Sequence, residues 1–265
     1  MTREKPCVLI TGATGNIGRK LRRHLAGRYE LRLVCLNPVN DFTVTTADLS
    51  QADEVWMRLF DGVDVVLHCA ADASAVAGWS EVERHNIDAT LNVFEAAVRG
   101  GAGRVVFMSS NWTMAGYRHG TERLTTDLPA RPVNPYGVSK LVCERIGRSF
   151  SVHHGLSVIC LRIGHCPARP KSKPGPQEKF GRRWMQQKWI SDRDLCQLVE
   201  RSILAGDVRF AVVNGVSDNP GMRWDLDGAR RLLGYAPADG RPAMLTPAAR
   251  ARELLAHWSH RLLRH

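Results

Sequence analysis

The sequence predicts an α/β protein built on a doubly wound parallel sheet. Three observations point to this fold class. Short apolar runs of strand length alternate with helical patterns between residues 8 and 163. A glycine-rich turn links the first run to the first helix, and polar residues directly follow later runs. Strands that alternate with helices form parallel sheets, and the carboxyl ends of such strands gather ligand-binding residues.

The first apolar run, Val8-Leu9-Ile10, predicts a buried strand. It leads into the turn Thr11–Gly18, which contains Gly12, Gly15 and Gly18, and a helical pattern follows. Glycines at this spacing let backbone amides approach a pyrophosphate at the positive end of the helix. The strand, turn and helix together predict a dinucleotide site of the Rossmann type.

The second predicted strand, 31–36, ends without the acidic residue that would bind the ribose 2′-hydroxyl of NAD. Cys35, Leu36 and Asn37 stand there instead. No arginine follows this strand to bind the 2′-phosphate of NADP, although Arg19, in the helix after the glycine turn, could do so in principle. The sequence therefore leaves the choice between NAD and NADP open.

Two further strands are expected before the middle of the chain. The run 44–49 predicts a third strand that ends at an acid, and a helix through residues 55 and 59 follows it. The fourth strand, 63–69, continues into small residues, which leave room for a ligand across the sheet edge. A long amphipathic helix over 82–98 contains Asn86 and ends at a group of glycines.

The fifth predicted strand, 104–108, delivers Ser109, Ser110 and Asn111 at its carboxyl end. Because ligands bind at that edge of a doubly wound sheet, Ser110 is placed to donate a hydrogen bond to a substrate oxygen. A polar loop to Pro135 follows, and the next helix begins with Tyr136.

Tyr136 and Lys140 lie four residues apart, so a helix brings both side chains to one face. A phenol has a pKa of about 10 and is a poor base at neutral pH. A nearby ammonium favours the phenolate and lowers that pKa toward the working range. The pair is therefore a minimal device for moving a proton on or off an alcohol oxygen.

After a sixth strand over 157–163, the alternation of strands and helices breaks. Residues 165–188 are rich in Pro, Lys and Arg, and we expect them to cover the site. A helix over 191–203, a strand over 210–213, a helix over 224–233 and a basic helix from 247 complete the prediction. We expect residues 1–164 to form a dinucleotide-binding Rossmann-like core with the catalytic helix, and 165–265 a small C-terminal substrate-binding part of the same domain.

The composition of the chain limits the kinds of partner that we expect it to bind. The chain of 265 residues carries a net charge of +11, much of it in 169–183 and the C-terminal helix. Basic residues do not alternate with aromatic ones, so we expect no nucleic-acid partner. No apolar run is long enough for a bilayer and no signal-peptide pattern opens the chain, so we expect a cytoplasmic protein without membrane attachment. The seven scattered cysteines predict neither a disulfide framework nor a metal site.

The glycine turn, the small residues after His68, Asn86, Ser110 and the Tyr136–Lys140 pair occur in the order of the short-chain dehydrogenase/reductase superfamily. The sequence resembles its extended, NAD-dependent epimerase/dehydratase branch. Further segments are similar to uronate dehydrogenases, and the similarity spans nearly the whole chain. These are Ser109-Ser110-Asn111, Thr121–Leu124, Pro129–Pro132, Arg162-Ile163-Gly164, Trp189-Ile190-Ser191 and Leu233-Gly234-Tyr235.

The resemblance implies roles for these residues. Tyr136 would accept the proton of the substrate hydroxyl, Ser110 would hold that oxygen, and Lys140 would lower the phenol pKa and bind the nicotinamide ribose. Asp48, with Leu49 beside it, would meet the adenine amino group. The residues expected to bind the cofactor, NAD or NADP, are Gly12, Gly15, Asn16, Ile17, Gly18, Cys35, Asn37, Asp48, Leu49, Cys69, Ala70, Ala71, Asn86, Tyr136, Lys140 and Ile163.

Departures from the uronate dehydrogenase pattern fall on the substrate pocket. Trp112 replaces a histidine, His165 replaces a serine, and Ala73 replaces a serine, with Ser74 adjacent. The uronate dehydrogenases have a carboxylate-binding arginine just before the Trp-x-Ser segment. Arg182 or Arg183 matches it only if the alignment is shifted by one residue. A lost hydrogen bond to a buried polar group costs about 1–3 kcal/mol, so these changes indicate a different substrate. The expected substrate-binding residues are Ala73, Ser74, Ser110, Asn111, Trp112, His165, Arg182 and Arg183.

The leading hypothesis is an NAD(P)-dependent oxidoreductase that transfers hydride between the cofactor and a hydroxyl or carbonyl of a polar, sugar-like small molecule. The basic segment 169–183 favours an anionic, uronate-like substrate. One alternative is a sugar epimerase or dehydratase that uses a transient oxidation, and another is a non-catalytic NAD(P)-binding sensor. The resemblance also implies a homodimer paired through the helices near 82–98 and 136–153.

Overall fold

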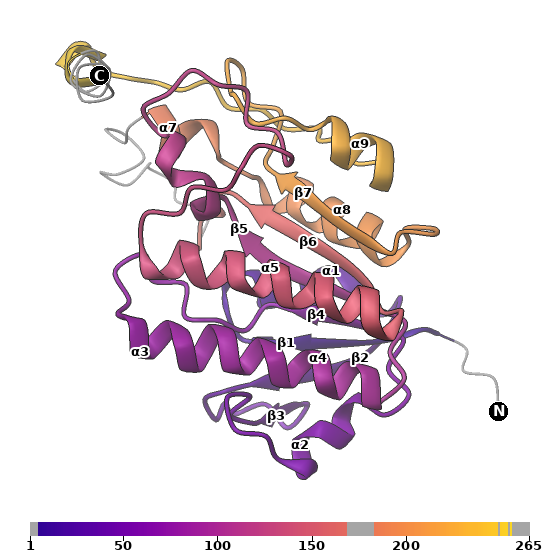
Figure 1. Cartoon of the computed structure of the whole chain (residues 1–265). Coiled ribbons are helices and arrows are strands. Elements are labelled where there is room, and N and C mark those ends of the chain that lie inside the picture. Colours follow the sequence, from indigo (N-terminus) through magenta and orange to yellow (C-terminus); the bar gives the residue numbers. More distant parts are fainter. Residues whose placement is uncertain (1–4, 169–182, 249, 254, 256–265) are drawn as a thin grey trace.

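The computed structural model describes residues 5–168, 183–248, 250–253 and 255. At its centre is a seven-stranded sheet in the order β3-β2-β1-β4-β5-β6-β7 (Figure 1). All six strand pairings are parallel. The strand order reverses between β1 and β4, which is the position where open α/β sheets bind ligands. The predicted doubly wound parallel sheet is confirmed.

The strands follow the predicted apolar runs closely. They are β1 (Cys7–Thr11), β2 (Glu30–Cys35), β3 (Val44–Thr46), β4 (Val65–His68), β5 (Arg104–Ser110), β6 (Ser157–Ile163) and β7 (Phe210–Gly215). Ser110 at the end of β5 pairs in register with Ile163 at the end of β6. The functional residues predicted after these two strands therefore emerge side by side.

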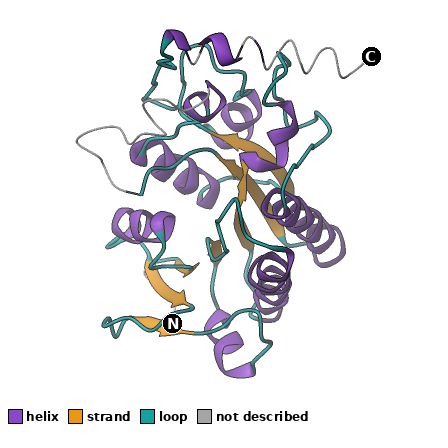
Figure 2. Cartoon of the chain, turned by 90° about the vertical axis from the view of Figure 1, so that its left-hand side faces the viewer, coloured by secondary structure: helices purple, strands orange, loops and turns teal. Residues whose placement is uncertain are grey.

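Helices cover both faces of the sheet, and Figure 2 shows the strands between the two helical layers. Contacts join α4 to α5 in one layer and α1 to α8 in the other. The helical elements are α1 (Asn16–Leu25), α2 (Glu54–Met57), η1 (Arg58–Phe60), α3 (Trp79–Val82), η2 (Glu83–Asp88), α4 (Ala89–Arg99), η3 (Asn111–Tyr117), α5 (Pro135–His154), α7 (Arg183–Gln187), α8 (Asp192–Ile203) and α9 (Asp227–Leu233).

Alternate residues of β1 belong to two separate cores. Val8 and Ile10 pack in the cluster that includes residues of α1 and α8. Cys7 and Leu9 pack in the cluster that includes residues of α4 and α5. All four side chains are completely buried, as expected for a parallel sheet covered on both faces.

The helix α5 begins where its sequence dictates. The Asn134 side chain accepts a hydrogen bond from Gly137 N at 2.9 Å, and Pro135 occupies the first helical position. The helix ends at Gly155, whose φ of 68° suits glycine. This N-cap fixes Tyr136 in the first turn, at the carboxyl edge of the sheet.

Most boundaries lie within about two residues of the predicted ones, but four features differ from the sequence prediction in kind. The third strand ends at Thr46, because Asp48 accepts hydrogen bonds from Ser50 and forms a turn. The helix predicted over 82–98 is interrupted by the π-helical segment η2. The loop predicted before Pro135 begins with the 3₁₀ helix η3. The helix predicted from Trp224 begins at Asp227, because Trp224 forms an isolated bridge with Leu124.

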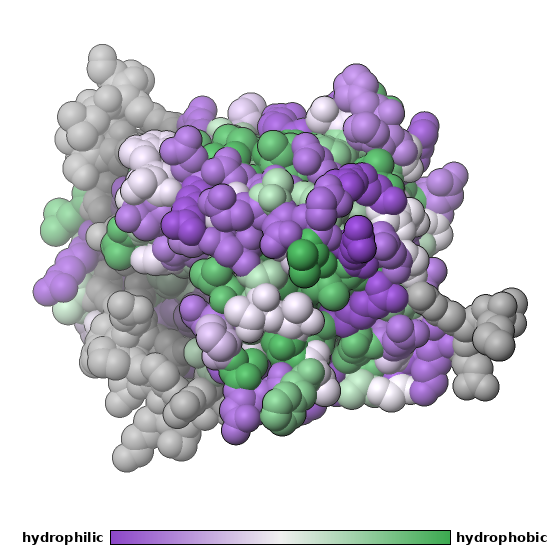
Figure 3. Space-filling model, turned by 90° about the horizontal axis from the view of Figure 1, so that it is seen from below, coloured by the Kyte–Doolittle hydropathy of each residue, from purple (hydrophilic) through white to green (hydrophobic). Residues whose placement is uncertain are grey.

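Residues 169–182, most of the predicted basic cover, lie outside the described part, as do most residues of the predicted final helix. The predicted division at residue 164 stays a prediction. Within the described residues, no helix combines the length and apolar character needed to cross a membrane. Figure 3 shows a face on which polar and apolar side chains are interspersed.

Candidate active site

The glycine turn between β1 and α1 is pressed against its surroundings. Gly12 has a φ of +64°, and a Cβ there would lie 2.7 Å from Ala70 N at the end of β4. A Cβ on Gly18 would lie 2.2 Å from Gly12 O. These positions require glycine, which has no Cβ and allows positive φ. The turn therefore has the close-packed form that brings backbone amides to a pyrophosphate.

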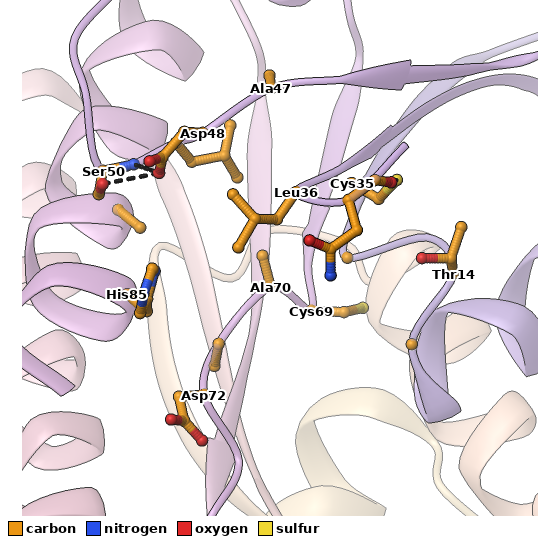
Figure 4. A pocket seen from close by; sticks show the side chains of 16 residues that line it. Thr14, Cys35, Leu36, Ala47, Asp48, Ser50, Cys69, Ala70, Asp72 and His85 are labelled. Carbon is orange, nitrogen blue, oxygen red and sulfur yellow. Dashed lines mark hydrogen bonds between the residues drawn. The ribbon is translucent and has the colours of Figure 1, made fainter. Parts of the chain in front are cut away.

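A pocket of about 380 Å³ opens at the carboxyl ends of β1, β2 and β4 (Figure 4). Predicted cofactor residues that line it are Gly12, Gly15, Cys35, Asn37, Asp48, Leu49, Cys69, Ala70 and Ala71. Residues that the sequence reasoning missed also line it, namely Thr14, Leu36, Ala47, Ser50, Asp72, His85 and Ala89. Glycine cradle and pocket together fit a nicotinamide dinucleotide.

The end of β2 and the residues after it form one wall of this pocket, at the position where the ribose of the cofactor is predicted to bind. Cys35 Sγ donates a hydrogen bond to Asn37 O at 2.9 Å, which closes a tight turn around Leu36. Figure 4 shows the Leu36 side chain projecting toward the middle of the pocket. A thiol, an amide and an alkyl group stand where NAD-specific sites carry a carboxylate.

Asp48 already has partners for both carboxylate oxygens. Its Oδ1 accepts hydrogen bonds from Ser50 N and Ser50 Oγ, and its Oδ2 pairs with Arg84 at 2.6 Å. Burial opposes ionisation, but the bonds from Ser50 and Arg84 hold the pKa of Asp48 below its ordinary value. Asp48 is therefore an ionised, oriented acceptor at the pocket wall, and its contact with adenine stays a prediction.

Ser110, Tyr136 and Lys140 meet beside the pocket and are nearly inaccessible to solvent. Lys140 Nζ donates to Met108 O at 3.0 Å and lies 5.9 Å from the centre of the Tyr136 ring. Ser110 lies close enough to the Tyr136 phenol to oppose the rise in its pKa. The structure thus brings together the three residues predicted to be catalytic.

Burial controls the protonation of this group. It raises the pKa of Tyr136, a hydrogen bond from Ser110 opposes the shift, and the charge of Asp72 adds to it. Burial also lowers the pKa of Lys140. Tyr136 is therefore a neutral phenol at neutral pH, and the lowering of its pKa by Lys140 stays a prediction.

Asn86 joins the loop after β4 to the catalytic helix. Its Nδ2 donates to Ser139 Oγ at 2.9 Å and to Asp72 O at 3.2 Å, and its Oδ1 accepts from Asp72 N at 2.8 Å. Asn86 lies in the π-helical η2, a kind of irregularity that is frequent at functional sites. Its amide orients Asp72 and the residue before Lys140; its predicted contact with the cofactor is untested.

His68 ends β4 behind the glycine turn. Its ring nitrogens are hydrogen-bonded to Thr11 Oγ1 at 2.7 Å and Thr90 Oγ1 at 3.0 Å. Burial, followed by the charge of Lys140, lowers the pKa of His68 to about 3. His68 is consequently a neutral strut, and Thr11 Oγ1 also accepts a hydrogen bond from Ala70 N.

A buried ion pair lies behind the catalytic group. Glu144 on α5 and Arg162 on β6 form two contacts, Nε to Oε1 at 2.9 Å and Nη2 to Oε2 at 2.8 Å. Ser109 Oγ donates to Glu144 Oε1 at 2.6 Å. Because Ser109 precedes Ser110, and Glu144 lies one turn after Lys140, this pair ties β5, α5 and β6 together under the site.

Three other predicted cofactor residues lie at the edge of the site and contact the protein around it. Asn16 Nδ2 donates to Cys166 O at 2.9 Å, which ties the segment after β6 to the start of α1. Ile17 packs against the core on that side. Ile163 is buried at the end of β6, beside Ser110.

The predicted substrate residues fall into different environments. Asn111 is completely buried, and neither its amide nitrogen nor its amide oxygen has a hydrogen-bond partner among the described residues. Trp112 is partly buried and donates its backbone N–H to Ser110 Oγ at 3.2 Å. His165 forms an isolated bridge with Trp189.

Ala73 and Ser74 are exposed on the loop after β4. Arg183 begins α7 and is exposed, with its backbone N–H and its guanidinium on Glu253. Arg182 lies outside the described residues. The contacts of these four residues with substrate stay predictions.

Lys188, which the sequence reasoning did not single out, is 2% exposed and lies 4.8 Å from the centre of the Trp112 ring. Burial lowers its pKa to about 8. A lysine in a basic segment carries no local sign of burial, and Trp112 is far away in the chain. Only the tertiary structure reveals this contact.

Comparison with known proteins agrees with this geometry. The NAD dependent epimerase/dehydratase family matches residues 8–186. The NAD-dependent glucose-6-phosphate dehydrogenase of Haloferax volcanii is 37% identical, covering 88% of this chain and 93% of the relative. The uronate dehydrogenase of Pseudomonas putida is 35% identical, covering 88% of this chain and 84% of the relative.

A solved structure of mutant uronate dehydrogenase from Agrobacterium tumefaciens, complexed with NAD, aligns with a TM-score of 0.76. It is 30% identical and covers 95% of this chain and 89% of that chain. The fold of this chain is therefore shared with that structure along nearly its full length. Within this fold lie the glycine cradle and the Ser110–Tyr136–Lys140 group. The chain belongs to the NAD dependent epimerase/dehydratase family, in the extended branch of the short-chain dehydrogenases/reductases.

Proposed function

We propose that this protein is an NAD(P)-dependent dehydrogenase that oxidises a ring hydroxyl of a sugar, at carbon 1. The observation that carries the proposal is the convergence of Ser110, Tyr136 and Lys140 beside the glycine-cradled pocket. The activities for which the relatives are named, on glucose 6-phosphate and on uronates, support a sugar-like substrate.

The dinucleotide would be held by the turn of Gly12, Gly15 and Gly18, with its adenosine half toward Cys35 and Asp48. When bound, it supplies the hydride acceptor. The small residues after β4, Cys69 to Ala71, leave the pocket open beside the catalytic group. The wall formed by Cys35 and Asn37 carries no acid, so it does not repel a 2′-phosphate, and both NAD and NADP fit this wall.

Tyr136 would take the proton of the reacting hydroxyl. In the structure its phenol is neutral and lies near the Ser110 hydroxyl, so a substrate oxygen placed between them would contact both. Tyr136 must become a better base as the hydroxyl loses its hydrogen, and Lys140 is the buried cation nearest to it on the same helix face. Ser110 would keep the oxygen in line, and Asn86 would fix α5 through Ser139.

The substrate side differs from the uronate dehydrogenase pattern at Trp112 and His165. Trp112 offers an apolar ring where the pattern has an imidazole. Asn111, with a buried amide lacking protein partners, is suited to bind ring hydroxyls, because a buried polar group without partners costs about 1–3 kcal/mol. The hydroxyls of a bound sugar would supply hydrogen-bond partners for the Asn111 amide.

A homodimer paired through α4 and α5 extends the proposal, as does a cytoplasmic location. These helices leave Leu91, Val142 and Val152 exposed at 38%, 36% and 67%. Light scattering of the purified protein should give twice the monomer mass. A contiguous patch of exposed apolar side chains marks an interface, so in the proposed dimer the partner subunit would cover these three side chains together.

The direct experiment is a steady-state screen of aldoses, uronates and sugar phosphates with NAD and with NADP, followed by nicotinamide absorbance. The protein should reduce one dinucleotide with at least one sugar, and Tyr136→Phe should lower kcat at least about a hundredfold. Tyr29→Phe, a change of the same kind far from the pocket, is the matched control. Absence of Tyr136-dependent reduction across the screen contradicts the proposal.

A further inference from the structure

Lys188 is a buried cation without a counterion among the described residues. It is 2% exposed, and no ion pair or hydrogen bond of its ammonium occurs within the described part of the chain. Burial is the cause of its lowered pKa, with no charged neighbour contributing. An ammonium removed from water is stable only with a compensating partner. The Trp112 ring at 4.8 Å supplies part of that compensation.

The backbone around Lys188 is held firmly in place. Lys188 O accepts from His165 N at 2.7 Å, and Ile190 N donates to His165 O at 3.0 Å. Asn219 Nδ2 donates to the carbonyl oxygens of both flanking residues, Gln187 at 3.0 Å and Trp189 at 2.8 Å. The ammonium is therefore presented from a fixed backbone, as a preformed binding group requires.

Lys188 also lies close in the fold to the catalytic residue Ser110. His165, its backbone partner, comes two residues after Ile163, and Ile163 pairs in register with Ser110. Trp112, its ring partner, donates its backbone N–H to Ser110 Oγ. Between Ser110 and Trp112 stands Asn111, fully buried with a nitrogen and an oxygen unpartnered. Two independent side chains at the same edge of the sheet, one cationic and one amide, thus lack partners among the described residues.

We infer that Lys188 binds the negatively charged group of the substrate, so that the enzyme selects an anionic sugar, a uronate or a sugar phosphate, over the neutral sugar. The inference rests on the proposed function and deepens it. A carboxylate or a phosphate provides the counterion that the buried ammonium lacks, and the sugar hydroxyls provide the partners for Asn111. The exposed Arg183 is already paired with Glu253 and is not needed for this selection.

The test separates this inference from the proposed reaction by measuring binding without turnover. In a Tyr136→Phe background loaded with NAD or NADP, calorimetry gives Kd for D-glucuronate, D-glucose 6-phosphate and D-glucose. The anionic sugars should bind at least tenfold more tightly than D-glucose. Whichever of the two shows the larger preference identifies the charged group as carboxylate or phosphate.

Adding Lys188→Met, which keeps the length and removes the charge, should lower the ratio of neutral to anionic Kd at least tenfold, and Lys188→Arg should retain most of it. Lys5→Met makes the same charge change at the amino end of the sheet and should leave the ratio unchanged. The Tm of Lys188→Met should not fall, because the change removes a buried charge.

An unchanged ratio in Lys188→Met, or no preference for anionic sugars in the parent, overturns the inference while sugar oxidation stands. If the wild-type protein oxidises no sugar and none binds, both the inference and the proposed function fail.

Discussion

Replacing Glu144 with glutamine should leave the buried guanidinium of Arg162 without its countercharge. The two side chains are 4% and 5% exposed and make two contacts of 2.9 and 2.8 Å. Breaking a buried pair by removing one partner costs about 3–5 kcal/mol. Glutamine keeps one oxygen that can accept from Ser109 or Arg162, so we expect the free energy of unfolding to fall by about 3 kcal/mol.

Urea unfolding followed by tryptophan fluorescence measures this loss as a change in the free energy of unfolding. Adding Arg162→Met to Glu144→Gln should restore most of the stability, because no unpaired charge then remains in the core. The control is Glu54→Gln, which breaks the exposed pair with Arg99 and should cost no more than about 1 kcal/mol. The reasoning is refuted if Glu144→Gln costs no more than this control, or if the double variant is less stable than the single one.

Three further outcomes are expected. Asn86→Ala removes hydrogen bonds to Asp72 and Ser139, and should lower the free energy of unfolding by about 2–3 kcal/mol and reduce kcat; unchanged urea and kinetic curves would contradict its positioning role. Gly18→Ala should weaken reduced-dinucleotide binding, followed by nicotinamide fluorescence, at least about tenfold, since its Cβ meets Gly12 O; an unchanged Kd argues against the cradle. Because burial lowers the pKa of Lys188 to about 8, its ammonium loses its charge as the pH rises through that value. The Kd of Tyr136→Phe for the preferred anionic sugar should therefore be flat below pH 8 and rise about tenfold per pH unit above it. A Kd that stays constant through that range would contradict the assignment.

Local patterns in the sequence were sufficient for the fold and the catalytic group. The apolar runs, the glycine turn and the i,i+4 spacing of Tyr136 and Lys140 each depend on neighbouring residues, and parallel topology then brings strand ends to one edge. Ser110 and Tyr136 could therefore be placed together before any tertiary contact was known.

Other features depend on contacts between distant segments. The pairing of Glu144 with Arg162 follows from how α5 packs on β6, and the burial of Lys188 against Trp112 follows from how the segment after α7 packs on η3. The π-helical turn at Asn86 exists because its amide bonds across to Asp72 and Ser139. Periodicity predicts a regular helix there, since it contains no information about those partners.

The central claim is that this protein removes hydride from carbon 1 of a sugar with Tyr136 as the base. Aldoses, uronates and sugar phosphates deuterated at carbon 1 can be incubated with the enzyme and NAD or NADP, and both products examined by mass spectrometry. The account predicts deuterium in the reduced nicotinamide and a sugar oxidised at carbon 1, with both products formed at least about a hundredfold more slowly by Tyr136→Phe. Recovery of the sugar with its deuterium in place and its configuration inverted at another carbon would contradict it and indicate an epimerase.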